Sequence, residues 1–424
     1  MYWGKSKNNE ARLAHICKST PIIDTHNDLP YLLRLQLHNE FQDESKFKFN
    51  GALTSNTDIP RLKKGKIGVQ FFSCYIECKE SDHLYQDFNK PNSAVRDTME
   101  QIDVTKRLTQ AYSSDLALVH SAEEAIKQYK SGKIAIALGV EGLHQVDSSL
   151  AVLRMYHELG VRYITLTHNC DNPFATAASS VVGGLPDKGL SSFGKDCILE
   201  MNRLGIMVDL SHVSLQTMYD ALETTKAPVM FSHSSAFALT NNERNVRDDV
   251  LLKVKENGGV VCVNFFPMFL VQKGKLVDEV TIEDAVDHVM HIVNLIGWDH
   301  VGFGSDFDGI PCGPQGLEDV SKYPDLVYKL MERSQATDDD IAKVMGGNVM
   351  RVWREAERVS QQSKDIAPVE TNWEKREWKF FKYLTELPEL FPGAYNAKNN
   401  VYDDSQSLVL TNKERPLSTN VDES

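Results

Sequence analysis

The chain has 424 residues, of which 42% are hydrophobic and 25% are charged, as in ordinary globular proteins. This length suffices for one large domain or two smaller ones, each with its own core. The net charge of −13 at pH 7 argues against a surface for nucleic acid or anionic membranes, because such surfaces are basic. The seven cysteines include no Cys-x-x-Cys pair, which argues against a zinc knuckle.

No export or anchoring segment is evident in the sequence. The N-terminus has no apolar core of the signal-peptide kind, and no apolar run reaches the roughly 20 residues that span a bilayer. The polar C-terminus does not fit a lipid-anchor signal, and no Asn-x-Ser/Thr glycosylation acceptor is present. As written, the sequence therefore predicts a soluble or cytoplasmic chain.

Eight short apolar runs have the near-continuous hydrophobic character of parallel strands that are buried on both faces. In chain order, we predict strands at 21–26, 67–75, 134–141, 162–168, 205–212, 227–233, 259–265 and 301–307. Helical patterns with capping signals fall between most of them, at 148–160, 213–223, 248–259 and 281–297. This alternation predicts an α/β fold, a (β/α)8 TIM-type barrel, with a doubly wound open sheet as the alternative.

The remaining segments are predicted to surround this barrel. The long connections after the first two strands, 29–66 and 76–133, are expected to hold insertions. We predict a (β/α)8 metallo-hydrolase domain over residues 1–360 and a C-terminal extension over 361–424. The extension is predicted to be helical at 372–384 and disordered after residue 395.

Polar side chains recur where the predicted strands end. They are His26, Asp28, Glu141, His168, His212, His233 and Asp306. Because the carboxyl ends of barrel strands meet at one mouth, we expect these side chains to lie together. Imidazole and carboxylate without thiolate suit Zn²⁺, Mn²⁺ or Fe²⁺, and the set is large enough for two ions bridged by a carboxylate.

Each residue alone has a simpler interpretation. A single histidine after a strand is more often packed or hydrogen-bonded than metal-bound, so the metal hypothesis depends on the recurrence. Asp24, inside the first strand, is predicted to orient a ligand histidine. For Arg244, two interpretations stay equally open: a surface partner of Asp248 and Asp249, or a residue at the mouth that binds a substrate carboxylate.

These stretches together resemble the membrane (renal) dipeptidases, a zinc-dependent family of the amidohydrolase superfamily. In order between residues 12 and 357, the stretches are IDTHNDLP, GVEGLHQVDSSL, RYITLTHNC, LGIMVDLSHVS, APVMFSHSSA, RNVRDDVL, GFGSDFDG and GLEDVSKYPDL. The resemblance implies a barrel enzyme that hydrolyses the peptide bond of free dipeptides through a metal-bridging hydroxide.

The resemblance also implies roles for individual residues. Two Zn²⁺ per chain are implied, one bound by His26 and Asp28, the other by His212 and His233, with Glu141 bridging them. The implied substrate contacts are His168 at the oxyanion, Arg244 at the C-terminal carboxylate, Asp306 at the amino end and in proton transfer, and Tyr75 in the pocket. Arg244 and Asp306 together favour a zwitterionic dipeptide, because each is otherwise an unpaired charge.

The resemblance further implies a disulfide between Cys78 and Cys170 and a homodimer. Membrane anchoring is typical of the family, although this sequence carries no signal for it. Two other functions are weighed here: an amidohydrolase acting on a cyclic or non-peptide amide, including a β-lactam, and an inactive binding protein.

Overall fold

The computed structural model describes residues 2–78 and 93–375. Contacts along the chain define one compact unit, Met1–Trp373, and a second one, Glu374–Ser424. Most of the predicted helix at 372–384, and all of the region predicted to be disordered, lie outside the described residues. The domain boundary at residue 360 stays a prediction.

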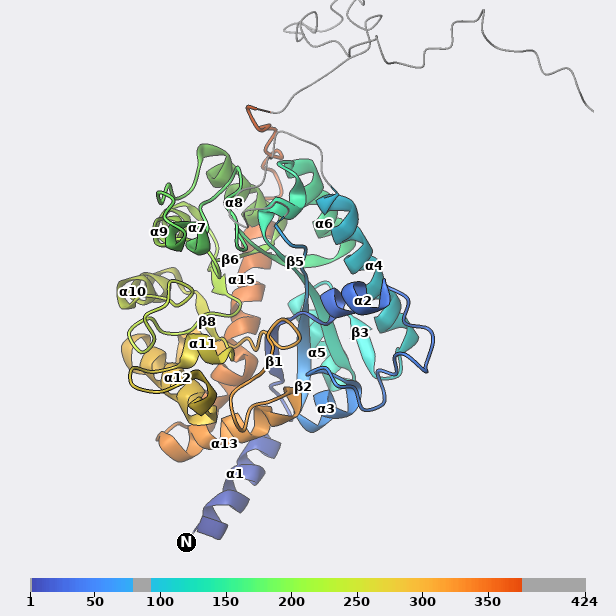
Figure 1. The fold of residues 1–424 in the computed structure, drawn as a ribbon, viewed down its shortest axis with the longest axis vertical. Helices are drawn as coiled ribbons and strands as arrows, with labels where there is room; N and C mark the ends of the chain where they lie inside the picture. Colours follow the sequence, from blue (N-terminus) through green and yellow to red (C-terminus); the bar gives the residue numbers. More distant parts are fainter. Residues whose placement is uncertain (1, 79–92, 376–424) are drawn as a thin grey trace, which may run out of the picture. The chain divides into compact units, whose positions relative to one another are not determined.

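The described residues of the first unit form a sheet of nine parallel strands (Figure 1). The strands are β1 Ile22–Asn27, β2 Ile67–Cys74, β3 Leu116–Leu118, β4 Ile134–Glu141, β5 Val161–Thr165, β6 Met207–Asp209, β7 Met230–Phe231, β8 Val260–Val263 and β9 Val301–Phe303. Eight of them follow the order β1-β2-β4-β5-β6-β7-β8-β9, while β3 pairs with β4 beside this path. A bridge from Asn27 to Phe307, four residues beyond β9, brings the segment after the last strand back to the first strand. The sheet is therefore a nearly closed barrel, which confirms the predicted (β/α)8 fold over the open sheet.

Helices alternate with the strands, as the pattern predicts. They are α1 Tyr2–Ile16, α2 Leu29–Leu37, α3 Ile59–Lys64, α4 Ala94–Ala111, α5 Ala122–Lys130, α6 Leu150–Leu159, α7 Ala178–Val182, α8 Ser192–Leu204, α9 Leu215–Thr224, α10 Asp248–Asn257, α11 Pro267–Leu270, α12 Ile282–Ile296, α13 Tyr323–Arg333, α14 Asp338–Ala342 and α15 Asn348–Gln362. The first long connection holds α2 and α3, and the second holds α4, β3 and α5. No described helix is both long and apolar enough to cross a membrane.

Local signals explain where these helices begin and end. The Ser149 side chain accepts a hydrogen bond from Val152 N at the start of α6, and Gly160 ends that helix with φ +112°. The Ser214 side chain caps α9 in the same way, and Thr281 begins α12 with a capping box. These side chains satisfy amide groups that a helix end would otherwise leave without a partner.

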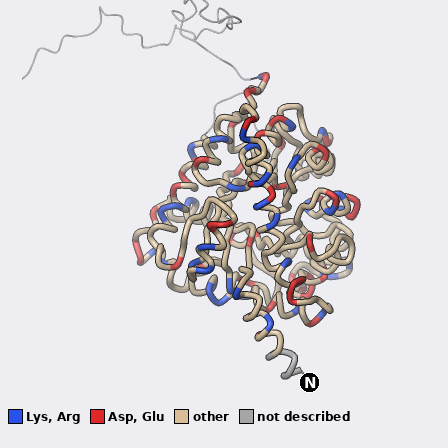
Figure 2. The backbone as a smooth tube through the Cα atoms, turned by 180° about the vertical axis from the view of Figure 1, so that it is seen from behind, with Lys and Arg blue, Asp and Glu red and all other residues tan. Residues whose placement is uncertain are grey.

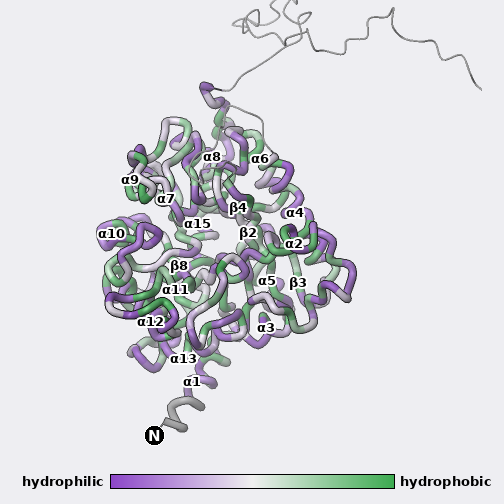
Figure 3. The backbone as a smooth tube through the Cα atoms, in the orientation of Figure 1, coloured by the Kyte–Doolittle hydropathy of each residue, from purple (hydrophilic) through white to green (hydrophobic). Residues whose placement is uncertain are grey.

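The core lies along the barrel strands and under the surrounding helices. Every residue of β2 and β4 is buried, and Figure 3 shows hydrophobic residues along both strands. Charged residues of both signs are interspersed over the outer turns of the face in Figure 2. Polar residues at the end of such a buried strand are costly unless they have partners or reach a partly open site.

Most strand ladders stop earlier than the sequence pattern predicts. β5 ends at Thr165, β6 at Asp209, β7 at Phe231 and β9 at Phe303, two or three residues before the predicted site residues. His212 and Asp306 then adopt left-handed backbone angles, φ +66° and φ +67°. This conformation is costly for a non-glycine residue and is concentrated at functional sites. The additional strand β3, which lies beside the eight-strand path, is only three residues long and is not among the predicted strands.

The barrel wall has no room for a side chain at Gly304. A Cβ there would lie 1.7 Å from the Ser232 carbonyl oxygen and 2.6 Å from Thr25 Oγ1. The Thr25 hydroxyl itself donates to Ser232 O (2.5 Å) and to Phe303 O (3.0 Å). The backbone segments at Thr25, Ser232 and Gly304 can therefore approach this closely only because residue 304 is a glycine. These segments carry His26, His233 and Asp306.

Gly304→Ala is therefore expected to lower the free energy of unfolding by about 3 kcal/mol or more, because backbone atoms must move. Gly274→Ala is the comparison variant: the added carbon has nothing within 4 Å, so its cost comes only from the backbone angle, φ +91°. That change is expected to cost about 1 kcal/mol. Urea or thermal unfolding of both variants measures the difference, and equal costs would contradict this account of the barrel wall.

Candidate metal centre

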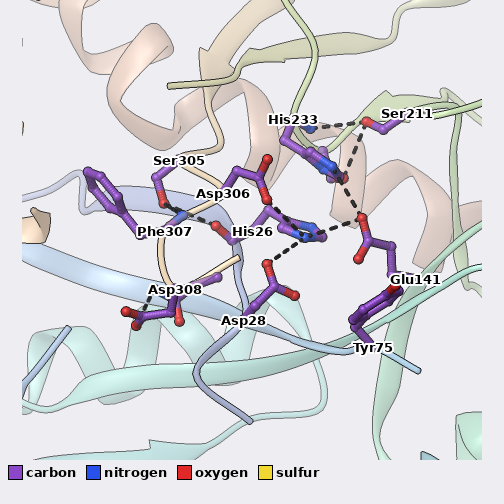
Figure 4. A network of polar contacts seen from close by, with 12 residues as sticks. His26, Asp28, Tyr75, Glu141, Ser211, His233, Ser305, Asp306, Phe307 and Asp308 are labelled. Carbon is purple, nitrogen blue, oxygen red and sulfur yellow. Dashed lines mark hydrogen bonds and ion pairs between the residues drawn. The ribbon is translucent and has the colours of Figure 1, made fainter. Parts of the chain in front are cut away.

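One oxygen of Glu141 lies among three histidines that come from different strand ends, and Figure 4 shows two of them, His26 and His233. Glu141 Oε1 is 3.0 Å from His212 Nε2, 3.2 Å from His233 Nε2 and 3.5 Å from His26 Nε2. The Nε2 atoms of His212 and His233 are 3.0 Å apart. β1, β4 and the segments after β6 and β7 thus converge as the strand-end pattern predicts.

Two further carboxylates lie on the other side of His26. Asp28 Oδ2 is 3.3 Å and Asp306 Oδ1 is 4.0 Å from His26 Nε2. Figure 4 shows both carboxylates directed toward the His26 ring. Asp306 is also held by Asn264, whose Nδ2 donates to its Oδ2 at 2.9 Å.

The donor atoms meet the requirements of a metal centre. Three groups of potential ligands each lie within 4.8 Å: His26, Glu141 and His233; Glu141, His168 and His212; and His26, Asp28 and Asp306. His26 Nε2 and Asp28 Oδ1 are buried and have no hydrogen-bond partner among the described residues. Such buried groups are costly unless a ligand or ion satisfies them. Glu141 belongs to two of these groups, and so does His26. The groups therefore overlap, as expected for two neighbouring ions.

The pKa shifts of the two aspartates indicate that negative charge is crowded at this centre. Burial raises the pKa of Asp28 to about 6 and that of Asp306 to about 7, and the Glu141 carboxylate beside them adds to both shifts. A nearby cation would favour the ionised forms. Burial lowers the pKa of His212 and His233 well below the usual value, so both rings are neutral, as metal ligands must be.

Each of the three imidazoles is oriented through its other nitrogen. His26 Nδ1 lies 2.9 Å from the Tyr163 hydroxyl, and His212 Nδ1 lies 3.2 Å from Asn169 Oδ1. His233 Nδ1 lies 2.8 Å from Ser232 Oγ. With the proton on Nδ1, every ring presents the Nε2 lone pair to the centre.

Asp209 supports this arrangement from behind. Its Oδ2 accepts hydrogen bonds from Ser232 Oγ and Thr165 Oγ1, both at 2.6 Å. Its Oδ1 accepts from the amides of Ser232 (2.8 Å) and Ser211 (3.1 Å). Because the Ser232 hydroxyl donates to Asp209, its oxygen accepts a hydrogen bond from the Nδ1–H group of His233, and this links the buried carboxylate to the ring.

Asp24 holds the predicted ligand His26 by its backbone amide and not by its ring. Asp24 binds Ser305 through N (2.9 Å) and Oγ (2.7 Å) and accepts from the His26 amide at 3.2 Å. It therefore ties the first strand to the last, while Tyr163 orients the His26 ring. Sequence reasoning missed Tyr163, Ser232 and Asp209. An aspartate inside the apolar run GIMVDL was the available signal, since a buried carboxylate needs several donors.

A cavity of about 340 Å³ opens beside the centre, and Arg244 forms part of its wall together with His168, Asp306 and Phe266. Arg244 is only 9% exposed, and its Nε and Nη2 have no hydrogen-bond partner among the described residues. Its guanidinium lies 5.2 Å from the ring centre of Phe269. Of the two interpretations of Arg244, the structure supports the mouth and not the surface. A buried guanidinium with free donors suits a carboxylate ligand.

Two more predicted residues border this region. The Tyr75 ring centre is 4.4 Å from that of His168, whose ring is likewise 4.4 Å from His212. Burial lowers the pKa of His168 to about 4, so this imidazole is neutral. A disulfide joins Cys78 to Cys170, close in sequence to Tyr75 and His168.

Comparison with known proteins gives a consistent result. The model of the membrane dipeptidase family, peptidase family M19, matches residues 10–367. An uncharacterised dipeptidase of Schizosaccharomyces pombe is 60% identical over 405 residues, covering 95% of this chain and 97% of that protein. Dipeptidase tcpJ of Claviceps purpurea is 43% identical over 346 residues, covering 82% of this chain and 79% of that protein.

A solved structure shares the fold. The metallopeptidase of Rhodobacter sphaeroides, liganded with a phosphinate mimic of the dipeptide L-Ala-D-Ala, aligns with a TM-score of 0.70 at 25% identity. The alignment covers 80% of this chain and 99% of that one. With the family match over most of its length, the chain belongs to the membrane dipeptidase family, peptidase family M19, and is a dipeptidase of that family.

Proposed function

We propose that this dipeptidase is zinc-dependent and holds two Zn²⁺ ions at the Glu141 centre. His26 and Asp28 would hold one ion, His212 and His233 the other, and Glu141 would contact both. The shared position of Glu141 among three imidazoles, each held through its Nδ1 atom, supports this assignment. Two bound ions would lower the pKa of a water between them toward 7 and polarise the substrate carbonyl.

The chain's own residues position the dipeptide around that centre. Arg244 binds the terminal carboxylate through its free guanidinium nitrogens, and Asp306 binds the terminal amino group. Because both line the same cavity, a substrate must present its two charged ends within it. A longer peptide would leave Arg244 without its partner, which explains a preference for two residues. This buried, unsatisfied guanidinium is the observation that carries the proposal.

Two residues serve the reaction itself. His168, neutral and beside His212, donates a hydrogen bond to the oxygen that becomes negative when the peptide carbon is attacked. Asp306 lies 4.0 Å from His26 and transfers a proton to the leaving amine, because its carboxyl group is an acid–base group at the edge of the centre and lines the substrate cavity. Tyr75 contacts His168 and limits the space above the ring.

Glu141→Gln is expected to lower the zinc content and to reduce kcat/KM for a Gly-Xaa dipeptide by at least about 100-fold, because the shared negative charge is lost. Zinc per chain is measured by mass spectrometry, and kcat/KM by a hydrolysis assay. Glu200→Gln is the control, since Glu200 is fully buried but pairs with Arg154 and Arg203 instead. Normal zinc content and turnover in Glu141→Gln would refute the bridging role.

Arg244→Ala is expected to cost about 2–4 kcal/mol in kcat/KM for a free dipeptide, about 30- to 1,000-fold, because a buried charge pair is lost. The same dipeptide with an amidated C-terminus should lose much less, since it offers no carboxylate. Arg247→Ala is the control, because Arg247 pairs with Glu243 and stacks on Phe237. Equal losses for acid and amide would show that Arg244 has only a structural role.

A further inference from the structure

A second cluster of potential ligands lies just beyond three of the active-site segments. Cys78 follows Tyr75 by three residues, His144 follows Glu141 by three, and Cys170 follows His168 by two. One nitrogen of His144 and the two Sγ atoms lie within 4.8 Å of one another. The segments after β2, β4 and β5 therefore meet at a second point beyond the active site, and the proposed dipeptidase mechanism does not use the residues there.

His144 has the properties of a ligand that lacks its ion. The side chain is fully buried, and its Nε2 lies 2.6 Å from the Ile76 carbonyl oxygen, to which it donates. A neutral imidazole that donates from Nε2 keeps its lone pair on Nδ1. That Nδ1 is buried and has no hydrogen-bond partner among the described residues. Leaving such an atom unsatisfied is costly, so its retention in a histidine that borders two cysteines calls for an explanation.

We propose that, when the disulfide is reduced, Cys78, Cys170 and His144 bind a zinc ion at a site separate from the Glu141 centre. A dithiol supplies the two electrons and two protons that convert the S–S bond into two thiols, and is itself oxidised to a disulfide. Zinc then displaces both thiol protons, and the sulfur lone pairs form the metal bonds without any change in the oxidation state of zinc.

The backbone spacing is compatible with this exchange. Two sulfurs bound to one tetrahedral zinc at about 2.3 Å lie about 3.8 Å apart. The Cα atoms of Cys78 and Cys170 are 6.1 Å apart, so rotation of the side chains can open the sulfurs to that distance. Cys78 is partly exposed, so a water molecule would reach the fourth position from its side of the cluster.

The bound ion would take over the cross-link that the disulfide provides. Under oxidising conditions the covalent bond ties the segment after β2 to the segment after β5. Under reducing conditions the ion would tie both to the segment after β4 as well. Tyr75, Glu141 and His168 would keep their relative positions in either state.

Cobalt binding to the full-length chain tests this site by light absorption, so no measurement of enzyme activity is needed. Cobalt thiolates absorb in the near ultraviolet, whereas the Glu141 centre contains no sulfur ligand. Protein reduced with a dithiol, freed of that dithiol by gel filtration and titrated with Co²⁺ should give this charge-transfer band, and the unreduced protein should not. Cys78→Ser should lose the band, and His144→Asn should need about tenfold more Co²⁺ for half saturation. Cys312→Ser, which alters an exposed free cysteine, should keep it.

Two results would overturn the proposal. The first is a reduced wild-type protein that gives no thiolate band, and the second is a band that survives in Cys78→Ser. Circular dichroism establishes whether each variant is folded. If His144→Asn does not fold, a Cys170→Ser variant decides the matter, because retention of its band would equally exclude the site.

Discussion

The site depends on one buried carboxylate oxygen that three imidazoles share. Glu141 Oε1 lies within 3.5 Å of His212, His233 and His26, so removing its charge affects every ring at once. Burial alone would raise the pKa of Glu141, yet the neighbouring histidines, His26 first, hold it well below its ordinary value. A bound cation would satisfy the donor atoms of this cluster that have no hydrogen-bond partner among the described residues. The proposal of bound ions rests on this packing of donor atoms at the barrel mouth.

The barrel makes this arrangement possible by bringing distant strand ends together, and a layer of hydrogen bonds then sets the orientation of each ring. Tyr163 forms a hydrogen bond with His26, and Ser232 lies between Asp209 and His233 with a hydrogen bond to each. Asp24 joins the first and last strands through Ser305, which closes the barrel next to the site. The left-handed backbone at His212 and Asp306 indicates that the fold tolerates local strain to direct these side chains inward.

Much of this could be predicted from the sequence, because the repeated pattern of an apolar run followed by His, Asp or Glu reports both the barrel and its mouth. Helix bounds were predictable where Ser149 or Thr281 supplies a cap. Ladder ends were not, since residues 166–168 and 210–212 look like strand but leave the sheet. The partners of each imidazole were also hidden: Tyr163 lies 137 residues from His26, and no local pattern reveals which ring its hydroxyl contacts.

The roles given to the individual ligands can be tested directly by the anomalous scattering of zinc in crystals of the purified enzyme. The account predicts two peaks beside Glu141, one contacted by His26 and Asp28 and the other by His212 and His233. A single peak, or peaks that Glu141 does not contact, would contradict the claim that this carboxylate joins two ions.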